Sequence, residues 1–221
     1  MKNSAQKAEI LSALGGRFRP LLNLSDKPPA STISTGAAAV DRLIEGLPRG
    51  AITEICGPPS SGRTSLLHSI LVEATTQQEA CALVDTTDAF DPASGARAGI
   101  DLDRLLWVRC AGSTEHALKS VDLLAHGGGF GILALDLGDL SPQNAKRIPL
   151  PCWYRLLRTI EHRPTALVIL DREPYACGSL VLGMNRERTE WSRILNGVLL
   201  RVERRKPGRA ATATFQARTA A

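Results

Sequence analysis

The chain has 221 residues, a formal net charge of +5 and a hydrophobic content of 43%, which allows one sizeable domain with a short appendage. No apolar run is long enough to cross a bilayer, and the first residues lack the apolar region of a signal peptide, so we expect a cytoplasmic protein. The five cysteines stand singly, without CxxC pairs. This pattern favours reduced thiols over disulfides or a metal site.

The N-terminal part of the chain is predicted to be a small appendage. Residues 5–14 carry apolar side chains at helical spacing and are followed by Gly15 and Gly16, which predicts a short helix. The segment Asp26-Lys27-Pro28-Pro29 then predicts a linker. We therefore expect a helix and linker over residues 1–30 and a core domain over residues 31–221. The helix either folds back on its own core or docks onto a neighbouring chain, and the sequence leaves both open.

A glycine-bounded loop joins the apolar run 51–56 to a segment with helical spacing that begins near Ser65. Backbone N–H groups in such a loop, together with the helix dipole, create a site for phosphate oxygens. The spacing fits a P-loop, although Arg63 occupies the lysine position. A simple turn between strand and helix is the alternative. The predicted nucleotide-binding residues are Gly57, Pro58, Pro59, Ser60, Ser61, Gly62, Arg63, Thr64 and Ser65.

A short apolar helix is predicted before the loop, at residues 37–44. After the loop, short apolar segments alternate with segments of helical spacing. The predicted strands are 80–85, 105–109, 130–135 and 165–170, and the predicted helices are 92–99, 114–126 and 149–162. This alternation predicts a parallel sheet covered on both faces. Asp85, Asp136 and Asp171 would then lie with Gly57 at the carboxyl edge, where ligands bind. Each aspartate alone is explained by helix capping, but their grouping favours a nucleotide.

The pattern changes after Asp171. Residues 198–202 and 210–215 are predicted to be two strands joined by a turn at Pro207-Gly208, forming an antiparallel hairpin at the edge of the sheet. From Arg186 onward there are nine basic and three acidic residues, so the basic excess is concentrated in this end of the chain. Such a distribution is typical of a protein that binds a polyanion such as nucleic acid, and equally of a solvated tail. Trp153 and Tyr154, near the start of a predicted helix, are expected to pack in the core.

Several spaced motifs together resemble the core of the RecA recombinase family. They are Ile33-Ser34-Thr35-Gly36, Leu47-Pro48-Arg49-Gly50, the segment from Glu54 to Thr64, the segment from Val84 to Pro92, and the segment from Gly99 to Leu106. The resemblance runs in matching order from about Ile33 to Asp136. It implies an α/β RecA-like P-loop fold, with a mostly parallel central sheet flanked by helices and an antiparallel C-terminal hairpin.

The resemblance also implies ATP and Mg²⁺ as ligands. It implies that Gly57–Thr64 holds the triphosphate, that Thr64 and Asp136 face Mg²⁺, and that Asp91 lies near the adenine. The chain departs from the family at three positions that contact or hydrolyse ATP in the family. Arg63 replaces the phosphate lysine, Thr87 stands where the family has a glutamate that polarises water, and Ser94 replaces the aromatic residue that stacks on the base.

These departures predict weak or absent ATP hydrolysis with nucleotide binding retained, because Thr87 cannot act as a base. Asp88 is adjacent, but neighbouring residues on an extended segment point to opposite sides. The family's γ-phosphate-sensing glutamine is replaced by Arg172.

Single-stranded DNA is the polymer partner that the resemblance implies. The family's first DNA-binding loop is expected to be shortened to residues 137–148, and the second, glycine-rich loop to be replaced by the segment 177–190, which carries Arg186 and Arg188. Cations remain available for phosphates. The candidate DNA-binding residues are Lys146, Arg147, Arg186, Arg188, Arg201, Arg204, Arg205, Lys206 and Arg209.

Two functional hypotheses follow. In the first, the chain is a RecA-like ATP-binding repair protein that acts with single-stranded DNA in the SOS response or translesion synthesis. In the second, it resembles the ImuA-type accessory proteins of SOS mutagenesis and works as a non-hydrolysing adaptor that contacts RecA or a translesion polymerase. Homo-oligomer or filament contacts through the N-terminal helix are compatible with both. A metabolic P-loop kinase is disfavoured, because no lid-like arginine cluster or second substrate motif is present.

Overall fold

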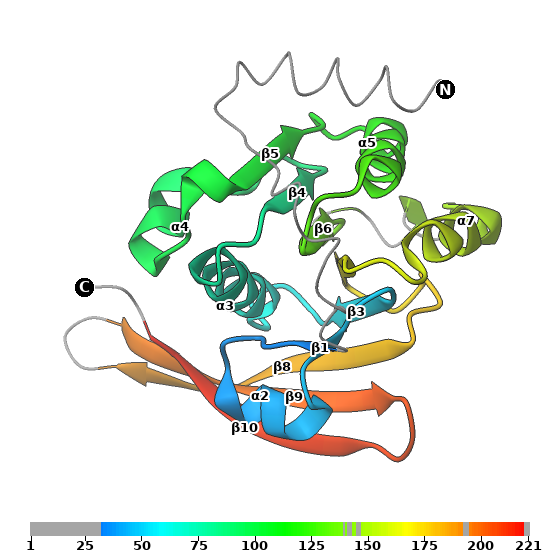
Figure 1. Ribbon diagram of the computed structural model, residues 1–221. Helices are drawn as coiled ribbons and strands as arrows, with labels where there is room; N and C mark the ends of the chain where they lie inside the picture. Colours follow the sequence, from blue (N-terminus) through cyan, green and yellow to red (C-terminus); the bar gives the residue numbers. More distant parts are fainter. Residues whose placement is uncertain (1–31, 139, 141–142, 145–146, 192–194, 219–221) are drawn as a thin grey trace.

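The computed structural model describes residues 32–218 except 139, 141–142, 145–146 and 192–194 (Figure 1). The predicted N-terminal helix and linker lie outside this part, as does Lys146. The main sheet has the strand order β10-β9-β8-β3-β7-β6-β4-β5. Its strands are β3 (Ile52–Cys56), β4 (Cys81–Asp85), β5 (Leu105–Arg109), β6 (Ile132–Asp136), β7 (Ala166–Asp171), β8 (Leu180–Trp191), β9 (Leu195–Lys206) and β10 (Ala211–Arg218).

The strands from β5 to β8 run parallel, and β8, β9 and β10 are antiparallel to one another. The apolar runs predicted as strands between residues 51 and 170 all appear, with ends shifted by at most two residues. The predicted fold class, a mostly parallel sheet flanked by helices, is therefore confirmed. A small separate sheet, which was not predicted, pairs β1 (Thr32–Ile33) with β2 (Leu47–Pro48).

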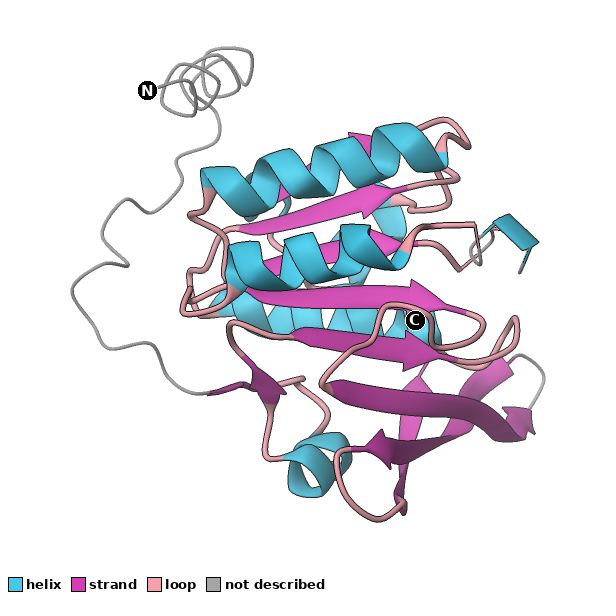
Figure 2. Ribbon diagram, turned by 90° about the vertical axis from the view of Figure 1, so that its right-hand side faces the viewer, coloured by secondary structure: helices cyan, strands magenta, loops and turns pink. Residues whose placement is uncertain are grey.

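Helices cover both faces of the parallel part of the sheet (Figures 1 and 2). They are α3 (Arg63–Thr76), α4 (Pro92–Ala98), α5 (Thr114–Gly127) and α7 (Leu150–Ile160), with a short 3₁₀ turn η1 (Leu102–Arg104), while α2 (Ala38–Ile44) lies on the antiparallel strands. Side chains of a strand alternate between faces. Leu83 accordingly packs in the cluster with α3, while Ala82 and Val84 pack in the cluster with α5 and α7. Among the described helices, none has the length and apolar character needed to cross a bilayer.

The helix predicted at residues 92–99 is confirmed as α4, and its two end residues act as the sequence predicts. The carboxylate of Asp91 accepts hydrogen bonds from the backbone N–H groups of Ala93 and Ser94, so Asp91 caps the N-terminus of α4. Gly99 ends the helix in the left-handed conformation, with φ of 102°. An aspartate before proline and a glycine just past the last turn are the ordinary end signals of a short helix.

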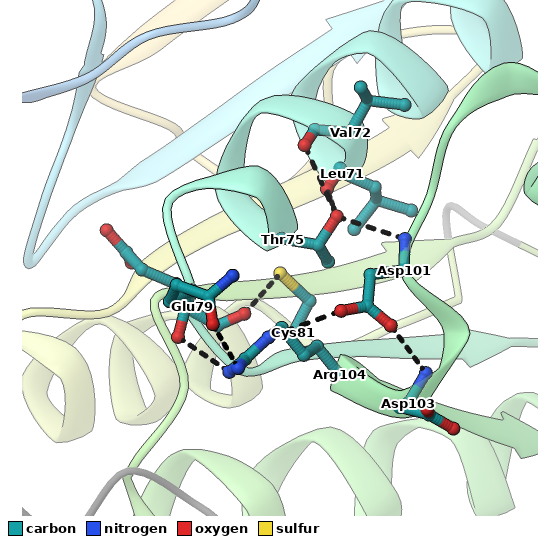
Figure 3. Close-up of polar contacts among 9 residues, drawn as sticks. Leu71, Val72, Thr75, Glu79, Cys81, Asp101, Asp103 and Arg104 are labelled. Atoms are coloured by element: carbon teal, nitrogen blue, oxygen red, sulfur yellow. Dashed lines mark hydrogen bonds and ion pairs between the residues drawn. The ribbon is translucent and has the colours of Figure 1, made fainter.

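A polar network that is buried at Thr75 and partly exposed at Arg104 fixes the C-terminal end of α3 against the entry to β5 (Figure 3). The hydroxyl of Thr75, which is 1% exposed, donates to the carbonyl of Leu71 and accepts from the backbone N–H of Asp101. Arg104 donates to the carbonyl of Gln78 and forms an ion pair with Asp101. The P-loop helix is therefore anchored at the end opposite the loop.

The C-terminal part contains the predicted hairpin and one strand more. β9 and β10 pair antiparallel on either side of the predicted turn, so the hairpin is confirmed. β8, which is 12 residues long, adds a third antiparallel strand where the segment 177–190 was expected to replace a loop, and the three strands form an antiparallel extension of the sheet. α2 packs on β9 and β10 (Figure 1). Leu182 and Met184 are buried in β8 while Asn185 is exposed. The polar outer half of β8 is held as strand by its pairing with β9.

α7 is amphipathic, and its two aromatic residues separate. Trp153 is 2% exposed and lies in the core with Leu156 and Ile160, as expected. Tyr154 is 53% exposed, so its predicted core role is wrong. Consecutive helical residues lie about 100° apart around the axis, so burying Trp153 turns Tyr154 toward solvent.

Candidate phosphate-binding site

The loop between β3 and α3 has the geometry of an anion site. Gly62 is the N-cap of α3 with φ of 90°, and no side chain caps the helix. The N–H groups of the first turn are thus available to a ligand. At Gly57, a Cβ atom would lie 2.4 Å from the carbonyl oxygen of Met184, so the loop can approach β8 only with glycine there. Thr64 and Ser65 begin the helix and are exposed.

A cavity of about 340 Å³ opens over this loop. Its wall consists of Ser60, Ser61, Gly62, Arg63, Thr64 and Ser65 together with Arg186, Val198, Leu200 and Ala217. Leu200 of β9 lies directly against Gly62, because a Cβ atom built on Gly62 would fall 2.3 Å from its Cδ1. The antiparallel extension therefore forms the far wall of the cavity. Arg186, predicted as a DNA-binding residue, lines this wall.

Arg63 is 8% exposed, and its Nη2 donates to the carbonyl oxygen of Gly138 over 3.3 Å. Nε of Arg172 donates to the same oxygen. Nη1 of Arg63 and Oγ of Ser61 are buried without a hydrogen-bond partner in the described part of the chain. Buried polar atoms normally have partners, so these two atoms fit a site completed by a polar ligand.

The two predicted metal-facing residues meet at a second, smaller cavity of about 60 Å³, which Thr64, Asp136 and Arg63 line together. Oδ1 of Asp136 accepts from the backbone N–H of Gly138. A hydroxyl and a carboxylate are ligands of the kind that Mg²⁺ takes beside phosphates and water. The described residues contain no cluster of three or more His, Cys, Asp or Glu that could hold a metal alone. The donor set thus fits an Mg²⁺ that arrives with phosphate.

Neither Thr87 nor Asp88 lines these two cavities. The carboxylate of Asp88 forms an ion pair with Arg109 and accepts from the N–H of Ala111, so it is held at the end of β5. Among the described residues that line the two cavities, Asp136 alone carries a carboxylate. The described walls of these two cavities therefore offer no second acid as a base for water.

The aspartates predicted at the carboxyl edge do lie there. Asp85 pairs in register with Asp136, and Asp171 with Cys56. None of Asp85, Asp136 and Asp171 caps a described helix, so the capping alternative is wrong for them. Asp85 instead accepts from loop N–H groups at Thr87, Ala89 and Phe90, and from Nε1 of Trp107.

Asp171 is buried, with 3% exposure. Its burial raises the pKa of the carboxyl group to about 6, and the nearby charges of Glu54 and Asp136 add to that effect. The hydrogen bond from the N–H of Arg172 and the positive charge of Arg63 act in the opposite direction. The pKa is raised because desolvation of the charged form is the largest of these effects.

A third cavity, of about 780 Å³, lies beside the first turn of α3. Ser65 and His68 of α3, Ser94 and Arg97 of α4, and Phe215 of β10 contribute to its wall. Asp91 is absent from that wall and caps α4 instead. Burial lowers the pKa of His68, whose ring meets Phe90 edge-on at 5.7 Å. Sequence reasoning missed His68 and Phe215, and no local signal could have found them, because the fold brings them together from distant segments.

The predicted DNA-binding cations fall into different surroundings. Arg201 and Arg205 form ion pairs with Glu187 and Glu203, and Arg204 donates to the carbonyls of Leu43 and Arg209. The remaining described members, apart from Arg186 in the cavity wall, have exposed side chains; they are Arg147, Arg188, Lys206 and Arg209. The structure therefore does not gather the set into one patch of free cations.

Comparison with known proteins places these features in a family context. The family model of the RecA N-terminal domain matches residues 16–145. Protein RecA of Ectopseudomonas oleovorans is 42% identical over 106 residues, covering 47% of this chain and 30% of the relative. Protein RecA of Chloroflexus aurantiacus (strain J-10-fl) is 35% identical over 186 residues, covering 76% of this chain and 53% of the relative. The chain thus spans about half or less of the length of these relatives.

A solved structure shows the same fold. The crystal structure of the RadB recombinase matches with a TM-score of 0.65 at 17% sequence identity, covering 84% of this chain and 96% of that one. At this identity the likeness concerns the fold alone.

Proposed function

Because this chain belongs to the RecA family, we propose that it is a recombination or repair protein that binds ATP with Mg²⁺ and hydrolyses it slowly or not at all. The observation that carries the proposal is the convergence of Arg63, Thr64 and Asp136 on one small cavity beside an uncapped helix N-terminus. That combination suits a polyphosphate and its metal.

In this proposal the N–H groups of Gly62 and of the first turn of α3 hold phosphate oxygens. The hydroxyl of Thr64 and the carboxylate of Asp136 hold the metal directly or through water. When bound, Mg²⁺ neutralises part of the phosphate charge. The base of the nucleotide would occupy the cavity between α3, α4 and β10. Ser94 lies in that wall, so at this position the base would meet a hydroxyl in place of the aromatic ring expected of the family.

Weak hydrolysis is supported by the surroundings of Thr87 and Asp88. A missing general base removes roughly 10²–10⁴ in rate. Thr87 has no carboxylate, and the carboxylate of Asp88 is held by Arg109. The same observation favours the second candidate function, a non-hydrolysing adaptor that contacts RecA or a translesion polymerase in the SOS response.

Single-stranded DNA remains the proposed polymer ligand, with the exposed cations as its phosphate contacts. A cytoplasmic location and assembly through the N-terminal helix are part of the same proposal.

The first experiment measures binding and turnover separately. ATP binding is measured by titration calorimetry, once in the presence of Mg²⁺ and once in the presence of EDTA, for the wild type and for Thr64→Ala. Thr159→Ala, on α7, serves as the control. We expect binding by the wild type, a loss in Thr64→Ala confined to the Mg²⁺ arm, and turnover near background with or without single-stranded DNA. Absence of nucleotide binding would overturn the proposal, and turnover at a rate typical of the recombinase would overturn its hydrolysis part.

The second experiment separates the two candidate functions. The full chain is used as bait in extracts of DNA-damaged cells, and single-stranded DNA binding is measured in parallel. Capture of RecA or a translesion polymerase, together with no measurable DNA affinity, would favour the adaptor. DNA affinity that requires ATP would favour the repair protein that acts on DNA itself.

A further inference from the structure

We propose that Arg186 of β8, rather than Arg63, is the side chain that contacts the terminal phosphates of the nucleotide. This inference rests on the proposed function, because it takes the loop Ser60–Ser65 to be a triphosphate site. It assigns the role of the missing P-loop lysine to a residue more than a hundred positions further along the chain.

The direction of Arg186 follows from strand pairing. Arg186 pairs in register with Leu200 of β9, and paired residues of antiparallel strands project to the same face. Leu200 lies against Gly62, so Arg186 shares the face that looks onto the P-loop. The register shifts between Arg186 and Arg188, and such bulges re-aim side chains. Glu187, in the bulge, pairs with Arg201 instead.

Arg186 is free to bind an anion. It is exposed, and in the described part of the chain its side chain has no hydrogen-bond or ion-pair partner, unlike those of Arg201, Arg204 and Arg205. No acidic side chain occurs among the described residues that line the cavity. Arg186 and the N-terminus of α3 thus have no countercharge in this wall, which makes the open side of the cavity electropositive. A ligand with several negative charges satisfies this arrangement, whereas a neutral one does not.

Arg63 is placed for a different task. Its Nη2 donates to Gly138 and its side chain is almost fully buried beside the carboxylates of Asp136 and Asp171. A phosphate bound at Nη2 would compete with these neighbours, so only the unpartnered Nη1 of Arg63 is left for a ligand, at the rear of the site. Arg186 faces the same loop from the open side, and its planar fork can donate two parallel hydrogen bonds to phosphate oxygens. Arg63 therefore closes the rear of the site, while Arg186 reaches the ligand.

The test compares the affinities of the full chain for Mg²⁺-ATP and for AMP, which lacks the terminal phosphates. We expect Arg186→Gln to weaken ATP binding about tenfold to a hundredfold and to leave AMP binding nearly unchanged. Arg186→Lys should recover part of the loss, because it keeps the charge without the fork. Arg158→Gln, which removes an exposed arginine of α7 that has no partner in the described part of the chain, should change neither affinity.

The outcomes separate this inference from the function on which it rests. If the wild type binds ATP and Arg186→Gln binds it equally well, or loses ATP and AMP affinity alike, the assignment of Arg186 is overturned while the nucleotide site stands. If the wild type binds no nucleotide, both are overturned. Unfolding midpoints of the variants, measured by circular dichroism, establish that each one is folded before its affinity is interpreted.

Discussion

Arg63 and Arg172 donate to one acceptor, the carbonyl oxygen of Gly138, each over a distance of 3.3 Å. Arg63 comes from the first turn of α3 and Arg172 from the end of β7, while Gly138 follows β6. Hydrogen bonds to this one carbonyl oxygen thus connect three segments at the carboxyl edge of the sheet. The carbonyl of Gly138 is thus linked to the cavity above the loop through Arg63, which lines that cavity.

The first prediction concerns Gly138→Ala. A Cβ atom at this position would lie 2.8 Å from Nη1 of Arg63 and 3.0 Å from Oδ1 of Asp136, so these side chains must move. We expect a loss of about 1–3 kcal/mol in the free energy of unfolding, together with weaker ATP binding. Urea unfolding measures the first and calorimetry the second. Gly127→Ala is the control, because nothing lies within 4 Å of its Cβ position; equal stabilities of the two variants would contradict the packing described for Arg63.

The parallel sheet could be predicted from local signals. Runs of four to seven apolar residues are typical of central strands that are buried on both faces. The loop between β3 and α3 could be predicted from the spacing of its glycines. The ends of α4 were likewise readable, because Asp91 and Gly99 act on their own neighbours in the chain. The family resemblance added the order of the motifs.

The antiparallel extension could not be predicted in the same way. Residues 185–190 are polar throughout, so they show no alternation of apolar and polar side chains, and only pairing with β9 makes them strand. The place of Arg186 depends on that pairing and on the bulge beside it. A count of basic residues therefore grouped Arg186 with Arg201 and Arg204, although the fold gives the three different surroundings.

The second prediction concerns pH. The pKa of Asp171 is raised by burial to about 6 from an ordinary value of 3.8, so between these values the folded state binds a proton that the unfolded state does not. Stability should therefore fall as the pH rises from about 4 through 6. Asp171→Asn, which can still accept from the N–H of Arg172, should be more stable than the wild type at pH 7.

Urea unfolding of both proteins across this pH range provides the measurement. The difference in unfolding free energy between variant and wild type should shrink as the pH falls below 6. A constant difference at all pH values would mean that Asp171 does not titrate in this range.

The third prediction concerns the buried ion pair between Arg49 and Glu79, whose nitrogen and oxygen atoms lie 2.6 Å apart. Their side chains are only 9% and 11% exposed. Glu79→Gln leaves a buried guanidinium without its countercharge, which should cost about 3–5 kcal/mol. Glu115→Gln breaks the exposed pair with Lys119 and should change stability by about 0.5 kcal/mol or less. Similar small losses in both variants would show that Arg49 is solvated in the folded protein.

The fourth prediction concerns DNA. Lys206 and Arg209 have exposed side chains without partners in the described part of the chain, whereas Arg204 is held by the carbonyls of Leu43 and Arg209. If single-stranded DNA binds this end of the sheet, each free cation that contacts phosphate adds about 0.7 to the salt dependence of the affinity. Lys206→Gln with Arg209→Gln should therefore lower the slope of log affinity against log salt by about twice that amount, and Arg158→Gln should leave it unchanged. Fluorescence anisotropy with a labelled oligonucleotide measures the slope. An unchanged slope in the double variant would mean that Lys206 and Arg209 do not contact DNA phosphates.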